Sequence, residues 1–365
     1  MKLVAQREAL LDPLQAVVGV VERRQTMPIL ANILISARSD RVSFTATDLE
    51  VELVASTNMS VEQEGEITVP GRKLLDIVKA LPEGVDVVFQ LSGEKVTVRA
   101  GRSRFTLSTL PATEFPVVED VHAQQTVTLP QGALKRLLEK THFAMAQQDV
   151  RYYLNGLLLE IAGPSVRAVA TDGHRLALCE AAVEGADASP QQVILPRKGV
   201  LELQRLISES GDVTLAIGTN HLRAELGDIR FTSKLIDGRF PDYERVIPAE
   251  AAEPVVADRE DLRRSLYRTA ILSNEKYRGI RLELKAGGLT MQAHNPEQEE
   301  AEEEVEVGYA GDEIEIGFNV NYLMDALSAL ESEQIHLMIR DPNSSCLIKD
   351  PETDECKYVV MPMRL

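Results

Sequence analysis

The sequence predicts an α+β fold made of three similar domains in tandem, each with two helices packed on antiparallel sheet. Three observations support this prediction. The chain has 365 residues, 44% of them hydrophobic, which is enough for two or three cored domains. Four types of segment recur in the same order three times. Within each copy, strand-like alternation and helical spacing of apolar residues follow one another.

The repeated unit begins with an amphipathic helix that runs into an apolar strand. A strand with a polar corner follows, then a strand that leads into a second helix, and finally a closing run of strands. Asp172 follows Asp48 by 124 positions, and Pro196 follows Pro70 by 126. A period near this length indicates whole domains rather than the short units of a solenoid.

The recurring segments occupy corresponding stretches in the three copies. The first type spans 10–36, 134–161 and 262–285, and the second spans 43–53, 168–178 and 290–303. The third type spans 67–81, 193–207 and 314–330, and the fourth spans 96–116, 222–241 and 346–365. Polar, proline-containing stretches at 117–126 and 248–258 mark the boundaries. The predicted domains are therefore 1–124, 125–250 and 251–365.

The charge of the chain is unevenly distributed. Its net charge of −18 disfavours a simple nucleic-acid binder, because DNA is also negative. Basic residues nevertheless gather on the polar faces of five of the six predicted helix regions, while the helix within 314–330 has none. This pattern favours contact with the DNA backbone without base reading. The basic residues are Arg23, Arg24, Arg72, Lys73, Lys79, Lys135, Arg136, Lys140, Arg197, Lys198, Arg205, Arg263, Arg264 and Arg268.

Two further stretches have complementary charge. Residues 297–306 contain seven glutamates, whereas Arg99, Arg102 and Arg104 alternate around Phe105 and Leu107. Such a pair of surfaces at opposite ends of one chain predicts head-to-tail contact between copies, which closes a dimer or ring.

The cysteines and the N-terminus indicate the compartment. The three cysteines are odd in number and lack CxxC spacing, so we expect incidental or buried thiols rather than disulfides or a zinc site. No apolar run approaches the ~20 residues that span a bilayer, and the N-terminus lacks the apolar core of a signal peptide. We expect a cytoplasmic protein with no metal and no cofactor.

The stretch "ATDGHRLAL" (170–178) gathers Asp172, His174 and Arg175 at a glycine turn. One interpretation is a hydrolytic enzyme that uses Asp172 and His174. No GxxxxGK[ST], HExxH or GxSxG motif supports it, and the first copy keeps Asp48 without the histidine. Another interpretation is a sequence-specific DNA-binding regulator. The net negative charge and the lack of a recognition motif disfavour it.

Longer motifs extend over nearly the whole chain. They are "QQDVRYYLNG", "VATDGHRLA", "FTSKLIDGRFPDYERV", "ILSNEKYRGIRL", "NPEQEEAEEE" and "YVVMPMRL". These motifs resemble the bacterial DNA polymerase III β subunit, the sliding-clamp family. The resemblance implies a clamp fold and a head-to-tail homodimer whose six similar domains form a ring around duplex DNA. It also implies a non-catalytic protein that tethers the replicative polymerase for processivity and is opened by an ATP-dependent clamp loader.

The resemblance also implies site residues. A groove for short, mostly apolar peptides from polymerases, the loader and repair proteins comprises Leu154, Thr171, Gly173, His174, Arg175, Leu176, Pro241, Arg245, Val246, Tyr277, Asn319, Tyr322, Ser345, Val359, Val360, Met361, Pro362, Met363 and Arg364. DNA contacts are Arg24, Arg72, Gln148, Tyr152 and Tyr153. The dimer interface sets Lys73, Arg102, Arg104, Phe105 and Leu107 against Ile271, Leu272, Glu297, Glu299, Glu302 and Glu303. Some relatives carry Phe where this chain has Tyr277, and we expect its hydroxyl to change the groove only modestly.

Overall fold

The computed structural model describes residues 1–21, 27–118, 120–183, 190–249 and 253–364. Within these residues each repeat runs strand, helix, four strands, helix, three strands, and the first repeat adds strand β5 (Ser60–Gln63). The predicted threefold α+β repeat is therefore confirmed. The helices are α1 (Arg7–Val17), α2 (Gly71–Ala80), α3 (Gln131–Glu139), α4 (Arg197–Leu206), α5 (Arg259–Ala270) and α6 (Val320–Ala329).

The strands correspond from repeat to repeat. The first repeat contains β1 (Lys2–Gln6), β2 (Asn32–Arg38), β3 (Arg41–Thr47), β4 (Val51–Asn58), β6 (Gly65–Pro70), β7 (Asp86–Ser92), β8 (Lys95–Ala100) and β9 (Ser103–Ser108). The second contains β10 (Gln125–Pro130), β11 (Gly156–Ala162), β12 (Ser165–Thr171), β13 (Arg175–Ala182), β14 (Gln191–Pro196), β15 (Asp212–Ile217), β16 (His221–Leu226) and β17 (Ile229–Lys234). The third contains β18 (Val255–Asp258), β19 (Gly279–Lys285), β20 (Gly288–His294), β21 (Glu300–Glu306), β22 (Ile314–Asn319), β23 (Gln334–Met338), β24 (Cys346–Lys349) and β25 (Cys356–Val360).

The chain divides into two compact units. Unit one is Met1–Gly132 with Lys198–Leu235, and unit two is Ala133–Arg197 with Ile236–Leu365. Unit one contains the sheets β5-β1-β7-β8-β9 and β10-β15-β16-β17-β4-β3-β2-β6. Unit two contains β14-β11-β12-β13-β25-β24-β23-β18 and β21-β20-β19-β22.

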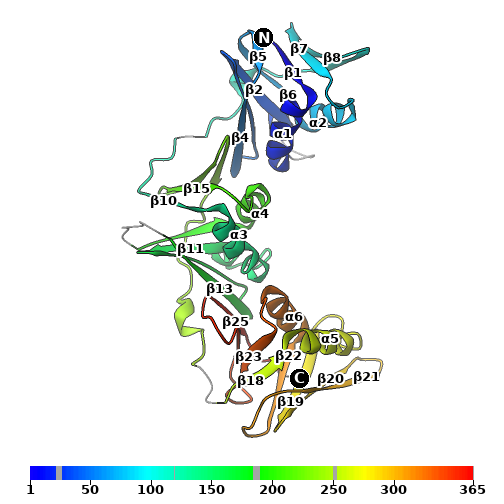
Figure 1. Cartoon of the computed structure of the whole chain (residues 1–365), viewed down its shortest axis with the longest axis vertical. Coiled ribbons are helices and arrows are strands. Elements are labelled where there is room, and N and C mark those ends of the chain that lie inside the picture. The colour runs from blue at the N-terminus through cyan, green and yellow to red at the C-terminus, as the bar shows by residue number, and fades with distance from the viewer. Residues whose placement is uncertain (22–26, 119, 184–189, 250–252, 365) are drawn as a thin grey trace. The chain divides into compact units, whose positions relative to one another are not determined.

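The eight-stranded sheets cross the repeat boundaries. In unit one, the last strand of the second repeat, β17, pairs antiparallel with β4 of the first. In unit two, the last strand of the third repeat, β25, pairs antiparallel with β13 of the second, as Figure 1 shows. Backbone hydrogen bonds thus join successive repeats, and the compact units divide the second repeat between them.

The helices cover the sheets with one apolar face. In α2 the buried residues are Gly71, Leu74, Leu75 and Val78, spaced as one stripe of a helix. α1 packs on α2 in unit one, and α5 packs on α6 in unit two. Among the described residues, no helix is both long and apolar enough to cross a membrane.

The prediction of three reduced cysteines is wrong for two of them. Cys179 and Cys356 lie opposite each other on β13 and β25, with Cα atoms 4.1 Å apart, and form a disulfide. Their 177-residue separation explains why no spacing motif indicated the pair. Cys346 is free and buried, and burial raises the pKa of its thiol to about 12.

Candidate functional site

The Asp172 corner is held by its own backbone. The Asp172 carboxylate accepts hydrogen bonds from the backbone N–H groups of His174 (2.9 Å) and Arg175 (3.1 Å). The Thr171 hydroxyl donates to the Arg175 carbonyl at 2.6 Å and accepts from the N–H of Gly173. The Asp172 carboxylate therefore caps a turn, as short polar side chains commonly do. This use leaves no support for a catalytic Asp172–His174 pair.

The first repeat builds the same corner from other side chains. Asp48 accepts from the N–H groups of Glu50 and Val51, and Thr47 donates to the Val51 carbonyl at 2.9 Å. Leu49 has φ 76° where Gly173 has φ 87°, so both corners need the left-handed conformation that glycine adopts most easily. The predicted assignment of the aspartate to a repeated structural corner is therefore supported by matching hydrogen bonds.

The corner of the second repeat differs from that of the first because it carries Arg175. Its Nη1 donates to Asp325 at 2.5 Å and its Nη2 to the Phe143 carbonyl at 2.8 Å. Its guanidinium carbon lies 4.4 Å from the centre of the Tyr322 ring, and the side chain is only 14% exposed. Arg175 thus ties the corner to α6 rather than projecting into solvent. The roles of Phe143 and Asp325 were not predicted, because no local motif links residues so far apart in the chain.

The C-terminal tail runs beside this corner. Leu176 pairs with Val359 and Arg175 with Val360 in the β13–β25 ladder, and the Met361 N–H donates to the His174 carbonyl at 2.9 Å. The Met363 N–H then donates to the Gly317 carbonyl of β22 at 2.7 Å. The tail therefore passes from one sheet of unit two to the other.

An apolar cluster supports the corner from beneath. It contains Leu176, Val359 and Tyr243, and Tyr153 and Val246 pack against it. The tail and the corner consequently stand on a packed base, which is the condition for a preformed binding surface.

Charged side chains of β11, β12 and β13 cover the same face of the sheet as the apolar cluster. The Tyr243 hydroxyl donates to Glu160 (3.0 Å) and accepts from Arg167 Nη1 (2.7 Å), and Arg167 also forms an ion pair with Glu180 at 2.8 Å. Burial raises the pKa of Tyr243 to about 12. Burial opposes ionisation of Glu180 as well, but hydrogen bonds from Arg167 and Ser165 and the nearby positive charges together outweigh it, and the pKa of this carboxyl is lowered.

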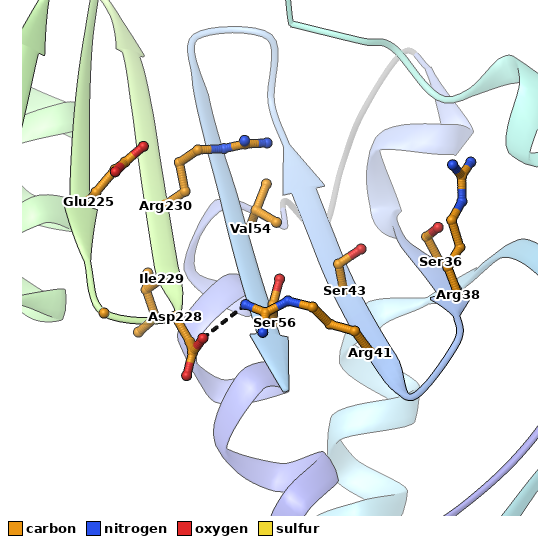
Figure 2. A pocket seen from close by; sticks show the side chains of 11 residues that line it. Ser36, Arg38, Arg41, Ser43, Val54, Ser56, Glu225, Asp228, Ile229 and Arg230 are labelled. Carbon is orange, nitrogen blue, oxygen red and sulfur yellow. Dashed lines mark hydrogen bonds and ion pairs between the residues drawn. The ribbon is translucent and has the colours of Figure 1, made fainter. Parts of the chain in front are cut away.

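The equivalent face in unit one is open. Ser36, Ser43 and Ser56 occupy the positions that hold Glu160, Arg167 and Glu180 in the second repeat. Figure 2 shows them on neighbouring strands, within a pocket of about 590 Å³. Small serines leave space where larger charged side chains fill it in unit two. The two corners are alike, but the strands that carry them present serines in the first repeat and large charged side chains in the second.

The predicted groove residues all lie in unit two. One group is buried and forms the base, namely Leu154, Thr171, Leu176, Val359 and Val360. A second group is exposed, namely Pro241, Arg245, His174, Tyr277 and Arg364. The remainder are half-buried, namely Gly173, Arg175, Val246, Asn319, Tyr322, Ser345, Met361, Pro362 and Met363. The structure brings the corner, the tail, Tyr322 and Val246 together, and the Asn319 amide donates to the Tyr277 carbonyl at 3.4 Å.

The residues predicted to contact DNA have different surroundings. Arg72 donates twice to the Val21 carbonyl, at 3.0 and 2.6 Å, so part of its guanidinium is already engaged. Gln148 is exposed and Tyr152 is 56% exposed, whereas Tyr153 packs on the apolar cluster. Arg24, like Arg23, lies outside the described residues.

Many of the basic helix residues have acidic partners. Lys140 is 9% exposed and its ammonium donates to Glu331 at 2.6 Å, so it is not available on a polar face. Ion pairs also join Arg136 to Glu355, Lys198 to Asp48, Arg205 to Glu202, Arg263 and Arg264 to Glu260, and Arg268 to Glu303. The positive charge on these helix faces is thus lower than the number of lysines and arginines in the sequence implies.

The complementary stretches lie on sheet edges. β9 ends one sheet of unit one, with Arg102 and Arg104 exposed, Phe105 half-buried and Leu107 buried. Lys73 on α2 is exposed as well.

The acidic stretch lies at the edge of another sheet. β21 ends one sheet of unit two, and Glu297, Glu299 and Glu302 are exposed in and beside it. Ile271 is 67% exposed and Leu272 half-buried. Glu303 instead accepts two bonds of 2.7 Å from Arg268 of its own chain.

Comparison with protein families matches the chain from end to end. Residues 1–119 match the N-terminal domain of the DNA polymerase III beta subunit, 128–242 its central domain and 244–364 its C-terminal domain. The "Beta sliding clamp" of Pseudomonas putida KT2440 is 56% identical, and that of Escherichia coli K12 is 50% identical, each over the full length of both chains.

Solved structures agree with these matches. The DNA polymerase III subunit beta of Pseudomonas aeruginosa is 54% identical, with a TM-score of 0.98 and complete coverage of both chains. The Caulobacter crescentus pol III beta is 42% identical, with a TM-score of 0.95 over both whole chains. The chain therefore belongs to the DNA polymerase III beta subunit family and is a DNA sliding clamp, a non-catalytic processivity subunit.

Proposed function

We propose that two copies of the chain assemble head to tail into a closed ring around duplex DNA. One observation carries this proposal. The last strand of the second repeat pairs with the fourth strand of the first, and the last strand of the third repeat pairs with the fourth strand of the second. By the same rule β9, the last strand of the first repeat, should pair with β21 of a third repeat. Within one chain the two strands do not pair, and each is an edge strand of its sheet. An unpaired strand edge is a template for another chain, and two such pairings close a dimer.

The repeat also predicts the register of this pairing. Arg230 of β17 lies opposite Val54 of β4, and Lys357 of β25 lies opposite Leu178 of β13. The corresponding residues at the free edges are Arg104 and Glu302. A directly opposed pair of opposite charge favours this register, and exposed Ile271 adds apolar area nearby. Lys73, Arg102, Phe105 and Leu107 are proposed to face Leu272, Glu297, Glu299 and Glu303 in the same interface.

The ring would hold DNA by enclosing it. Contacts by Arg24, Arg72, Gln148, Tyr152 and Tyr153 would be numerous, weak and indifferent to sequence, which is what sliding requires. The ion pairs of the basic helix residues support weak attraction to DNA, because a cation paired with a carboxylate attracts phosphate less strongly than an unpaired one.

The groove in unit two is proposed to bind short, mostly apolar segments of the replicative polymerase, the clamp loader and other polymerases and repair proteins. Half-buried methionines suit such a surface, since a flexible side chain adapts to several partners.

We propose domain bounds of 1–124, 125–250 and 251–365, and a cytoplasmic location.

Retention on DNA tests the ring directly. The chain is loaded onto a nicked circular duplex by a clamp loader, and half of the sample is then linearised. We expect retention on the circle and rapid loss from the linear molecule. Equal retention on both would mean that affinity, and not enclosure, holds the protein.

A further inference from the structure

A pocket of about 490 Å³ opens beside the tail on the sheet β21-β20-β19-β22. Three of its lining residues, Tyr277, Met363 and Arg364, belong to the proposed groove. The other side of the pocket is formed by residues with no role in that groove, chiefly Arg281 and His294. The pocket is therefore continuous with the groove and extends it onto the sheet.

The strand register creates this pocket. Arg281 on β19 lies opposite Gln292 on β20 and also opposite Gly317 on β22. Met363 pairs with Gly317, which places the tail at the end of the same row. Gly279, two residues before Arg281, also lines the pocket and adds no side chain. The floor stays open for this reason, while Arg281 and Gln292 form one wall.

The lining of the pocket is basic. It contains the guanidinium groups of Arg281 and Arg364 and the imidazole of His294, and among the described residues that line it there is no carboxylate. The pocket of unit one, by contrast, includes Glu225 and Asp228.

Three acids outside the lining are bonded to residues within it. Glu315 pairs with Arg281 at 3.3 Å, Glu302 accepts from the Gln292 amide at 2.8 Å, and Glu299 accepts from the Asn295 amide at 2.6 Å. The Arg281–Glu315 pair is exposed on both sides, at 43% and 60%. Exposed ion pairs of this kind are weak, so another carboxylate can replace Glu315 at little cost.

We propose that this side pocket binds an acidic side chain in the part of a partner segment that flanks its docked apolar residues. The inference rests on the proposed peptide groove, with which the pocket shares Tyr277, Met363 and Arg364. Arg281 would bind the carboxylate with two parallel N–H donors, a geometry that lysine cannot supply. A basic flank would be repelled, so the pocket ranks partner segments that have equal apolar cores.

Peptides with one shared apolar core test this proposal. The core is flanked on its amino or carboxyl side by Asp-Asp, Asn-Asn or Lys-Lys, and fluorescence anisotropy measures the Kd for the full chain at low salt. We expect Asp-Asp on one side to tighten binding about 3- to 10-fold over Asn-Asn. Lys-Lys on that side should weaken binding.

Variants separate the side pocket from the groove. Arg281→Gln should remove the Asp-Asp gain and leave the affinity for the bare core unchanged. Gln292→Glu, which adds a carboxylate beside Arg281, should have the same effect. Arg340→Gln is the matched control, since this exposed arginine pairs with Asp341 and lines a different pocket.

Each contrary result has one meaning. An Asp-Asp gain that persists in both variants overturns the side pocket and leaves the groove standing. Loss of bare-core affinity in both variants also overturns it, because these residues would then support the groove itself. If the bare core does not bind the wild-type chain, the proposed groove fails and the side pocket fails with it.

Discussion

Arg175 lies over the ring of Tyr322 at 4.4 Å and donates to Asp325 on the same helix at 2.5 Å. The residue that makes the Asp172 corner resemble an active site is therefore an internal link between β13 and α6. The corner, the helix and the C-terminal tail form one structure, and its exposed parts are available for binding.

Arg175→Ala should lower both stability and peptide affinity. The substitution removes the side-chain donor to the Phe143 carbonyl and to Asp325, and one of the donors to Asp172, at a cost of about 1–3 kcal/mol. Urea unfolding and anisotropy with a core peptide measure the two effects. His174→Ala is the matched control, because this exposed side chain should affect affinity alone. Unchanged stability in Arg175→Ala would contradict the role as a link.

Deletion of residues 361–365 should abolish peptide binding and leave the dimer intact. The tail is attached by the backbone bonds of Met361 and Met363, which are remote in sequence from both proposed interface edges. Anisotropy and analytical ultracentrifugation provide the readouts. A monomeric deletion variant would show instead that the tail supports assembly.

Reversal of one charge at the proposed edge should weaken the dimer, and exchange of both should restore it. Arg104→Glu would oppose Glu302, and we expect at least about a 10-fold increase in the dimer Kd. The double variant Arg104→Glu with Glu302→Arg should recover most of the affinity. Sedimentation over a concentration series measures this, with Arg38→Glu as an exposed control. Failure of the double variant to recover would refute the register.

Thiol titration should find one reactive cysteine in the unreduced, denatured chain and three after reduction. Cys346 is the free thiol, while Cys179 and Cys356 are joined. Cys356→Ser should lower the free energy of unfolding by about 2–4 kcal/mol under oxidising conditions, because the cross-link restrains a long loop. Under reducing conditions the difference should shrink. Three reactive thiols without reduction would contradict the pairing.

Acid should weaken the Lys140–Glu331 contact. The hydrogen bond from Lys140 lowers the pKa of Glu331 below its usual 4.5, so the contact stabilises the fold fully above that value. Its contribution is lost as the pH falls below 4.5, through the lowered pKa of Glu331 in the folded chain. Because the Glu331 side chain is 74% exposed, we expect about 0.5 kcal/mol or less. Urea unfolding of Glu331→Gln should show a shallower loss over this range, and identical pH profiles would argue against the contact.

Much of the fold was predictable from local pattern. Alternating apolar residues indicated the strands, apolar residues at helical spacing marked faces such as Leu74, Leu75 and Val78, and recurrence of Asp48 at Asp172 marked the repeat. The corner was also predictable as structural, because its hydrogen bonds join residues at most four positions apart. These features depend on neighbours in the chain, and the sequence therefore carries them directly.

The threefold repeat, the capped corners and the charge of the two stretches that become β9 and β21 can all be predicted from the order of residues along the chain. Which residues meet across long separations depends on the tertiary structure. It paired Cys179 with Cys356, placed Arg175 on Tyr322, buried Lys140 against Glu331 and left β9 and β21 as edges. The physical reason is that local pattern sets which face of an element is apolar, whereas the pairing of strands and the packing of helices set which side chains that face meets.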